Sequence, residues 1–303
     1  MTAPATRCGF VAILGAPNVG KSTLLNRLIG TKVSIVSPKV QTTRRRVLGI
    51  TIRGETQLVF VDTPGIFEPQ KRLDRAMVDA ALRGGEDADV VLVVVDAKRG
   101  LDKRTSLVFE RLKDSRQPKM LVLNKIDLLR PPELLPLIAA ANERLAFERT
   151  FLVSAEKGDG CDALLGALPD RMPEGPWLFP EDQLSDLSER VLASEITREH
   201  LFRQLHDELP YSLTVETEGY AEAADGKAVR IDQTIYVRRG SQKAIVLGDG
   251  GQQIKRVGEA ARLELEEIMG RKVHLFLFVK VREGWVDDPE RYREMGLDYP
   301  GDG

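Results

Sequence analysis

The sequence predicts two domains of different class: an α/β domain with a mostly parallel sheet and helices on both faces, then an α+β domain. Short β-rich runs alternate with helical segments in the first half, whereas the second half groups its β-rich segments together. A proline-rich stretch at residues 169–182 separates the two patterns, because proline continues neither a helix nor a strand ladder. We place the first domain at residues 1–173, a linker at 174–190 and the second domain at 191–303.

The first domain should alternate strands with helices along the chain. Near-continuous apolar runs such as Val90–Val95 indicate strands that helices cover on both faces. We expect strands at Phe10–Leu14, Val47–Ile52, Gln57–Val61, Val90–Val95, Met120–Leu123 and Phe151–Val153. We expect helices at Lys21–Ile29, Arg72–Arg83, Lys103–Lys113, Pro132–Ala146 and Asp162–Leu168.

The second domain should begin with a helix and continue with two strands around a tight turn. Gln183–Leu209 has helical character, and Ser212–Glu218 and Ala228–Arg238 are predicted to form a strand pair around residues 224–227. Between Val246 and Val281 the order is an apolar run, a glycine-rich loop, a helix and a strand.

The composition is that of an ordinary globular protein. The chain is 42% hydrophobic and 30% charged with a net charge of −2, which excludes a disordered chain and a generally basic nucleic-acid coat. Cys8 and Cys161 form neither a metal-binding spacing nor a disulfide framework. Because the longest apolar runs are only strand-length, we expect a cytoplasmic protein with no membrane span and no secretion signal.

The segment Gly15–Ser22, GAPNVGKS, fits the P-loop pattern GxxxxGK[ST] between an apolar run and an amphipathic helix. Backbone N–H groups in such a loop surround phosphates, and the start of the following helix favours the same anions. Lys21 should reach the β- and γ-phosphates, and Ser22 should bind Mg²⁺. Neighbours that should also line the nucleotide are Asn18, Val19, Gly20 and Thr23. The alternative is a simple glycine-rich turn. The apolar run before the motif and the amphipathic helix after it argue against this alternative.

A second motif, Asp62-Thr-Pro-Gly65, follows the apolar run Gln57–Val61. A carboxylate at the end of a strand can hold Mg²⁺ through water, and the N–H of Gly65 can contact the γ-phosphate. Seen in isolation, Asp62 would equally suit a turn.

A third and a fourth motif can read the base. In Asn124-Lys125-Ile-Asp127 the Asp127 carboxylate can accept hydrogen bonds from guanine N1–H and the exocyclic amine, a pair that adenine lacks. Ser154-Ala155, after the last strand, can place a backbone N–H on guanine O6. Asp127 alone could instead cap a helix, but four motifs in this order at strand ends predict a guanine-nucleotide site.

These motifs resemble the TRAFAC class of translation-associated GTPases. The class has a switch I threonine that completes the Mg²⁺ shell only when GTP is bound. Within Gln41-Thr42-Thr43-Arg44 our first candidate is Thr43 and our second is Thr42. Because the basic run Arg44-Arg45-Arg46 follows directly, the segment could instead be an ordinary solvated surface loop or an RNA contact.

Hydrolysis should be slow. Ras-like GTPases place a water-orienting glutamine after the glycine of the second motif, whereas Ile66 occupies that position here and cannot polarise water. Asn18 resembles the asparagine through which potassium-activated relatives hold K⁺ beside the phosphates. The expected catalytic residues are Asn18, Lys21, Thr43, Asp62 and Gly65, with Mg²⁺ on Ser22, Thr43 and Asp62 and K⁺ on Asn18.

The loop Gly248–Gly251 fits the GxxG pattern of KH domains, in which backbone and helix start lie close to a nucleic-acid strand. Residues 226–286 contain twelve Lys/Arg and seven Asp/Glu, a local excess of five positive charges. The helix that follows has an apolar stripe at Ile254, Val257, Ala261, Leu265 and Ile268. The alternative is a glycine turn before an ordinary core helix.

Longer segments resemble the bacterial Era family of GTPases over nearly the whole chain: PWLFPEDQLSD at Pro176–Asp186, SEITREHLFRQLHDELPYS at Ser194–Ser212 and VKVREGWVDD at Val279–Asp288. The resemblance implies a type II KH domain that binds the 3′ end of small-subunit ribosomal RNA. The expected RNA contacts are Gly248, Asp249, Gly250, Gly251, Lys255, Arg256, Arg238 and Arg239. Asp249 departs from the basic residue common at its position, and its carboxylate should repel phosphate.

We therefore expect a GTP- and Mg²⁺-dependent ribosome-assembly factor whose nucleotide state gates RNA binding and which aids maturation of the 30S subunit. We also expect a monomer. The family resemblance adds peripheral contact with the inner face of the cell membrane. The alternative is a GTPase-controlled subunit of an RNA-modifying enzyme, although the sequence shows no second catalytic or metal constellation. An elongation factor would need β-barrel domains for which this chain has no room.

Overall fold

The structure is a computed structural model whose contacts group the chain into two compact units. The ranges that it describes are residues 6–39, 42–206, 209–284 and 288–299. The first unit comprises Met1–Ser34, Thr43–Asp186 and Tyr292–Gly303, and the second comprises Ile35–Thr42 and Leu187–Arg291. Gln41 of the expected switch I motif lies outside the described residues, as do residues 207–208 and 285–287 of two Era-like segments.

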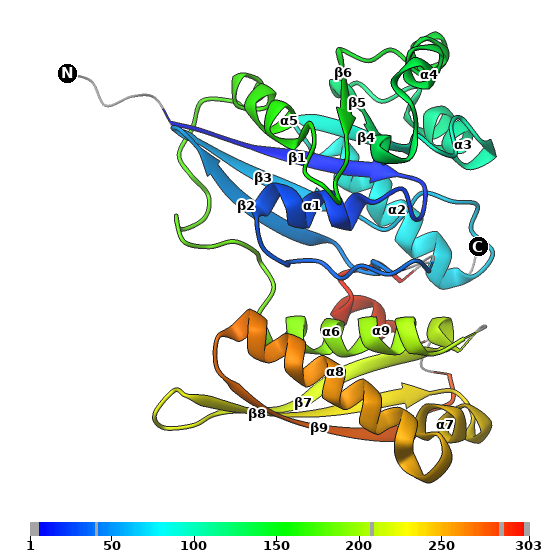
Figure 1. Cartoon of the computed structure of the whole chain (residues 1–303), viewed down its shortest axis with the longest axis vertical. Helices are drawn as coiled ribbons and strands as arrows, with labels where there is room; N and C mark the ends of the chain where they lie inside the picture. Colours follow the sequence, from blue (N-terminus) through cyan, green and yellow to red (C-terminus); the bar gives the residue numbers. More distant parts are fainter. Residues whose placement is uncertain (1–5, 40–41, 207–208, 285–287, 300–303) are drawn as a thin grey trace. The chain divides into compact units, whose positions relative to one another are not determined.

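The first unit is a sheet with helices on both faces (Figure 1), as the sequence predicts. Its elements are β1 (Arg7–Gly15), α1 (Lys21–Ile29), β2 (Val47–Arg53), β3 (Thr56–Asp62), α2 (Arg72–Glu86), β4 (Val90–Asp96), α3 (Lys103–Leu112), β5 (Lys119–Asn124), α4 (Pro131–Arg144), β6 (Arg149–Val153) and α5 (Cys161–Ala167). Helices α1 and α5 lie together on one face, and α2 lies on the other.

The strand order β2-β3-β1-β4-β5-β6 brings the chemistry of the unit to one edge. All neighbouring strands are parallel except β2, which pairs antiparallel with β3. Strands β3, β4 and β5 are buried along their whole length, which explains their continuous apolar runs. Because parallel strands end at the same edge of a sheet, the residues that end β1, β3, β4 and β5 converge: Gly15, Asp62, Asp96 and Asn124.

The proline-rich stretch packs on the first unit. Trp177 and Phe179 pack against the cluster around Val59, and the Gln57 side chain accepts the backbone N–H groups of Leu178 at 2.9 Å and Phe179 at 3.1 Å. This part of the predicted linker is therefore anchored to strands β1, β2 and β3 of the sheet. The domain boundaries at residues 173 and 190 stay predictions.

The second unit is a three-stranded sheet with helices packed on one face (Figure 1). Its elements are α6 (Glu189–Gln204), β7 (Leu213–Glu222), β8 (Ala228–Val237), α7 (Gly240–Leu247), α8 (Gln252–Met269) and β9 (Lys272–Val281). A short helix, α9 (Pro289–Glu294), follows β9 in the chain, and from Tyr292 onward its residues belong to the first unit. Strand β8 is central, antiparallel to β7 and parallel to β9. Helices α6 and α8 pack on each other and on the sheet, which gives the predicted α+β fold.

The predicted apolar stripe of α8 is confirmed. The apolar run before the GxxG loop, whose secondary structure the sequence did not determine, is helical. Val257, Ala261 and Leu265 are buried in the core of the second unit. The run at 245–247 is the last turn of α7, a helix whose start is fixed by Gln242, because its Oε1 accepts the N–H groups of Arg238 and Arg239. The GxxG loop therefore connects two helices.

Candidate functional site

The P-loop turns sharply between β1 and α1. Gly20 has a φ of +96°, and a Cβ at this position would lie 2.3 Å from Nδ2 of Asn124. Any side chain at Gly20 would therefore collide with the Asn124 side chain at the end of β5. The loop is closed from the other side by the N–H of Ile66, which donates to the carbonyl oxygen of Gly15 at 3.0 Å.

Lys21 is held inside this loop. Its side chain is buried, and Nζ donates to the carbonyl oxygens of Gly15 at 3.4 Å and Ala16 at 3.2 Å. Burial lowers the pKa of Lys21 to about 8, although the Asp62 carboxylate opposes this shift. An anion such as a phosphate would stabilise the charged ammonium in this desolvated position.

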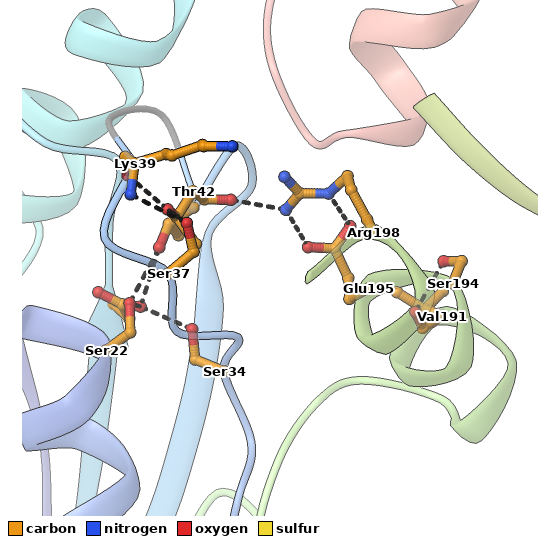
Figure 2. A network of polar contacts seen from close by, with 11 residues as sticks. Ser22, Ser34, Ser37, Lys39, Thr42, Val191, Ser194, Glu195 and Arg198 are labelled. Carbon is orange, nitrogen blue, oxygen red and sulfur yellow. Dashed lines mark hydrogen bonds and ion pairs between the residues drawn. The ribbon is translucent and has the colours of Figure 1, made fainter. Parts of the chain in front are cut away.

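Oxygen donors converge on Asp62 at the end of β3 (Figure 2 shows Ser22 and Ser34 of this network). Oδ2 of Asp62 accepts hydrogen bonds from Ser22 at 2.7 Å, Ser34 at 2.8 Å and Thr43 at 3.4 Å. The hydroxyls of Ser22 and Thr43 are themselves 3.0 Å apart. Burial raises the pKa of Asp62, and the Lys21 charge and the three hydroxyls act in the opposite direction.

This group of oxygens fits Mg²⁺. Oδ1 of Asp62 is buried and has no hydrogen-bond partner among the residues that the structure describes. Carboxylate and hydroxyl oxygens are the ligands that Mg²⁺ takes alongside phosphates and water. The described residues contain no cluster of three or more His, Cys, Asp or Glu side chains that would hold a metal by itself. Ser22, Thr43 and Asp62 would therefore share Mg²⁺ with a bound nucleotide.

The two threonine candidates have different surroundings. The hydroxyl of Thr43 reaches Ser22 and Asp62, whereas that of Thr42 donates to the carbonyl oxygen of Lys39 at 2.7 Å. Of the two hydroxyls, only that of Thr43 lies beside Ser22 and Asp62, where it could join them in holding Mg²⁺.

Asn124 links three loops. Its Nδ2 donates to the carbonyl oxygen of Val19 in the P-loop at 2.8 Å. Its Oδ1 accepts from the N–H of Lys125 at 2.8 Å and from that of Ala155 at 3.0 Å. Both polar atoms of this amide thus hold the loops together, and the side chain is almost completely buried.

Lys125 strengthens the same link. It adopts a φ of +65°, which is unusual for a residue with a side chain, and its Nζ donates to the carbonyl oxygen of Asn18 at 2.8 Å and to Oδ2 of Asp96 at 2.7 Å. Asn18 also has a positive φ, of 64°. The apex of the P-loop is therefore fixed from the base-recognition side.

Asp127 lines an open cavity beside the P-loop residue Gly20. Oδ1 of Asp127 accepts a hydrogen bond from Ser154 at 2.7 Å, and Oδ2 is 3.9 Å from Nζ of Lys157. The residues that line the cavity are Gly20, Thr23, Asn124, Lys125, Asp127, Leu128, Ser154, Ala155 and Glu156. The structure thus brings the predicted base-reading residues together around one cavity.

Three residues of this site are absent from the sequence-based prediction: Arg27, Ser34 and Asp96. Nε of Arg27 in α1 donates to the carbonyl oxygen of Ala155 at 3.1 Å, and the guanidinium also donates to the carbonyl of Glu156. Asp96 ends a buried strand, as Asp62 does, and this signal could have identified it. Arg27 and Ser34 carry no comparable local signal.

The GxxG loop of the second unit is built from glycines with positive φ. A Cβ on Gly248, whose φ is +72°, would lie 2.5 Å from Cβ of Gln253, so this position tolerates no side chain without a shift. Gly250 and Gly251 also have positive φ but face open space. Asp249, which follows Gly248, is exposed.

The predicted basic contacts divide into two groups. Lys255 and Arg256 are exposed near the start of α8, directly after the loop. Arg238 and Arg239 are exposed before α7, and the eight-residue helix carries them about 12 Å along its axis from the loop. The structure therefore brings only the first pair to the loop itself.

Comparisons with known proteins agree with this geometry. Residues 10–125 match the family described as 50S ribosome-binding GTPase, and residues 208–286 match the KH domain. GTPase Era of Sinorhizobium medicae is 60% identical over 295 residues, which cover 97% of this chain and 95% of that protein. GTPase Era of Mesorhizobium japonicum is 60% identical over 297 residues, covering 98% and 96%.

Two solved structures are similar over almost the whole chain. Era in complex with MgGDPNP and nucleotides 1506–1542 of 16S ribosomal RNA has a TM-score of 0.90 at 42% identity, covering 96% of this chain and 99% of the other. A variant of Era from Aquifex aeolicus bound to GDP and AlF4⁻ has a TM-score of 0.89 at 42% identity with the same coverage.

The fold and the site define a P-loop GTPase domain followed by a type II KH domain. The predicted fold class is thereby confirmed. The chain belongs to the Era family of GTPases, at about 60% identity over nearly its full length. Within the described residues, no helix is long and apolar enough to cross a membrane.

Proposed function

We propose that this chain is a ribosome-assembly factor in which the nucleotide state gates binding to the 3′ region of small-subunit ribosomal RNA. The observation that carries the proposal is the GxxG loop at the start of α8, where Gly250 is exposed and a Cβ at Gly250 or Gly251 would meet open space. A strand of RNA can approach the backbone closely there, and the helix start favours its phosphates. The Era structure that contains nucleotides 1506–1542 of 16S ribosomal RNA supports this choice of RNA.

Charge around the loop is mixed. Lys255 and Arg256 offer positive charge to RNA phosphates, whereas the exposed carboxylate of Asp249 opposes them. We infer that the start of α8 supplies most of the electrostatic attraction near the loop. Arg238 and Arg239 would contact a different part of the RNA.

Hydrolysis of GTP should be slow and promoted by a cation. Ile66 is completely buried, so no side chain at this position can orient the attacking water. Ser22, Thr43 and Asp62 would hold Mg²⁺, which would neutralise charge on the β- and γ-phosphates when bound. Asn18, at the apex of the P-loop, would hold K⁺ beside the phosphates.

We further expect a monomeric, cytoplasmic protein. Partners in the 30S subunit and peripheral contact with the inner face of the cell membrane are expected from the family resemblance.

Binding of a labelled oligonucleotide that matches the 3′ end of small-subunit ribosomal RNA tests the proposal. With a GTP analogue bound, Gly250→Asp should weaken binding at least about tenfold, because a carboxylate would meet the RNA backbone. Gly226→Asp is the matched control, since Gly226 also has a positive φ and open space but lies in the turn between β7 and β8. Equal affinity of wild type and Gly250→Asp would contradict the proposed RNA site.

A further inference from the structure

Asp96 ends strand β4 directly beside the base-recognition motif. In the parallel pairing of β4 with β5 it lies opposite Asn124, and the N–H of Ala97 donates to the carbonyl oxygen of Asn124 at 2.9 Å. The residue after Asn124 is Lys125. The register of the two strands therefore brings the Asp96 carboxylate and the Lys125 ammonium to the same end of the sheet, within the first unit.

The turn after β4 fixes the Asp96 carboxylate. Asp96 is 4% exposed, and its Oδ1 accepts from the backbone N–H groups of Lys98 at 3.0 Å and Arg99 at 3.3 Å. Its Oδ2 lies 2.7 Å from Nζ of Lys125 and 3.8 Å from Nε of Arg99. The carboxylate thus divides its two oxygens between a backbone turn and the lysine.

Lys125 passes this restraint on to the P-loop. The Nζ that donates to Asp96 also donates to the carbonyl oxygen of Asn18 at 2.8 Å. The Lys125 side chain is 32% exposed, and a long lysine side chain without a fixed partner samples many rotamers. Because the Asp96 carboxylate is itself held by the turn, it selects the rotamer of Lys125 that reaches the apex of the P-loop.

We propose that Asp96 is a positioning residue for nucleotide binding: it holds the Lys125 ammonium against the carbonyl oxygen of Asn18, so that the P-loop has its binding shape before a nucleotide arrives. A site that is ordered in advance binds more tightly, because less conformational entropy is lost on binding. The three residues act on the P-loop backbone, so the effect should be similar for GDP and GTP.

Asp96→Asn separates this role from that of a turn former. Asparagine has a single side-chain oxygen, which can accept from the turn as aspartate does, but its NH2 group would then face Nζ of Lys125, donor against donor. In the full-length protein without RNA, we expect the Kd values for GDP and for a GTP analogue each to rise about tenfold. Titration calorimetry measures both. A residue that only forms the turn would leave them unchanged.

A double-mutant cycle with Lys125→Met shows whether Asp96 acts through Lys125. Methionine keeps an unbranched apolar chain but donates no hydrogen bond, so Asp96 then has no ammonium to hold. The double variant should bind GDP as Lys125→Met does, within about twofold, whereas independent effects would multiply.

Asp102→Asn is the matched control. Oδ1 of Asp102 also accepts from two backbone N–H groups, those of Arg104 at 3.0 Å and Thr105 at 2.9 Å, but these bonds cap helix α3. Asparagine caps a helix as well as aspartate does, and the substitution removes the same negative charge. GDP affinity should therefore equal that of the wild type.

Three results would overturn the proposal. They are wild-type GDP affinity in Asp96→Asn, losses that multiply in the double variant, and an equal loss in Asp102→Asn. If Asp96→Asn does not fold, the double variant, in which the two donors no longer face each other, is compared with Lys125→Met. Equal GDP affinity then supports the proposal, and a further loss beyond about twofold contradicts it. Because RNA is absent, none of these results depends on the proposed RNA site.

Discussion

Asn124 donates from Nδ2 to the carbonyl oxygen of Val19 at 2.8 Å, and this hydrogen bond joins the base-recognition loop to the P-loop. Its Oδ1 accepts from Lys125 and Ala155, so the loops that would hold phosphates and base form one hydrogen-bonded unit. Removing the amide leaves buried backbone groups of three loops without partners, which costs more than the bonds themselves.

Asn124→Ala should therefore lower the affinities for GDP and for GTP to a similar extent, by about ten- to a hundredfold. The melting temperature of the nucleotide-free protein should also fall. Titration calorimetry and thermal unfolding check both effects. Asn142→Ala is the control, because Asn142 is exposed on α4 and its side-chain amide donates to Ile138 of its own helix. If the variant lost affinity for GTP but kept its affinity for GDP, this structural role would be contradicted.

Asp127→Asn should change the preferred nucleotide from guanine to xanthine. The carboxylate accepts where guanine donates, whereas the amide would offer N–H to the xanthine oxygen at that position. Ser154, which donates to Oδ1 of Asp127 in the wild type, can still donate to the one oxygen that the amide keeps. We expect GDP affinity to fall roughly a hundredfold and XDP binding to appear, as measured by competition. Unchanged GDP affinity would show that Asp127 does not read the base.

Ile66→Gln should not accelerate hydrolysis. Ile66 is completely buried, so an amide placed there would lose its hydrogen bonds to water and cost about 1–3 kcal/mol of unfolding free energy. The melting temperature should fall by several degrees while kcat stays at or below that of wild type. Ile245→Gln, at a 57% exposed position, should change neither. An increase in kcat for Ile66→Gln would mean that the side chain can reach the attacking water.

Hydrolysis should be faster in K⁺ than in Na⁺, and the difference should depend on the Asn18 side chain. Asn18 has a φ of 64°, so Asn18→Gly removes the side chain without adding backbone strain. Asn18→Gly should lose the K⁺ effect, and Asn18→Asp, which keeps an oxygen ligand, should retain part of it. Equal rates in both salts for the wild type would eliminate this site.

The sequence predicts the parts of the fold that local patterns determine. Continuous apolar runs locate β4 and β5, and the P-loop and base-recognition motifs fall at strand ends, as parallel sheets require. The antiparallel pairing of β2 has no such signal, because its residue pattern does not show strand direction.

Long-range contacts account for what the sequence does not show. Arg27 and Ala155 are 128 positions apart, and Arg198 and Thr42, whose carbonyl oxygen accepts from Nη2 of Arg198, are 156 apart. No sequence pattern relates the two residues of either pair, so neither contact can be predicted from the sequence. The grouping of Ile35–Thr42 with the second unit is likewise visible only in three dimensions.

The central claim is that GTP and RNA bind in a coupled way, and thermodynamic linkage gives it a direct test. Coupling is reciprocal, so an oligonucleotide of the ribosomal RNA 3′ end should raise affinity for a GTP analogue by the factor by which the analogue raises RNA affinity. We predict that each ligand raises the affinity for the other at least about fivefold. When GDP replaces the analogue, we predict no increase in affinity. The measurement is the analogue's Kd with and without saturating oligonucleotide. Identical Kd values in the two conditions would contradict the account.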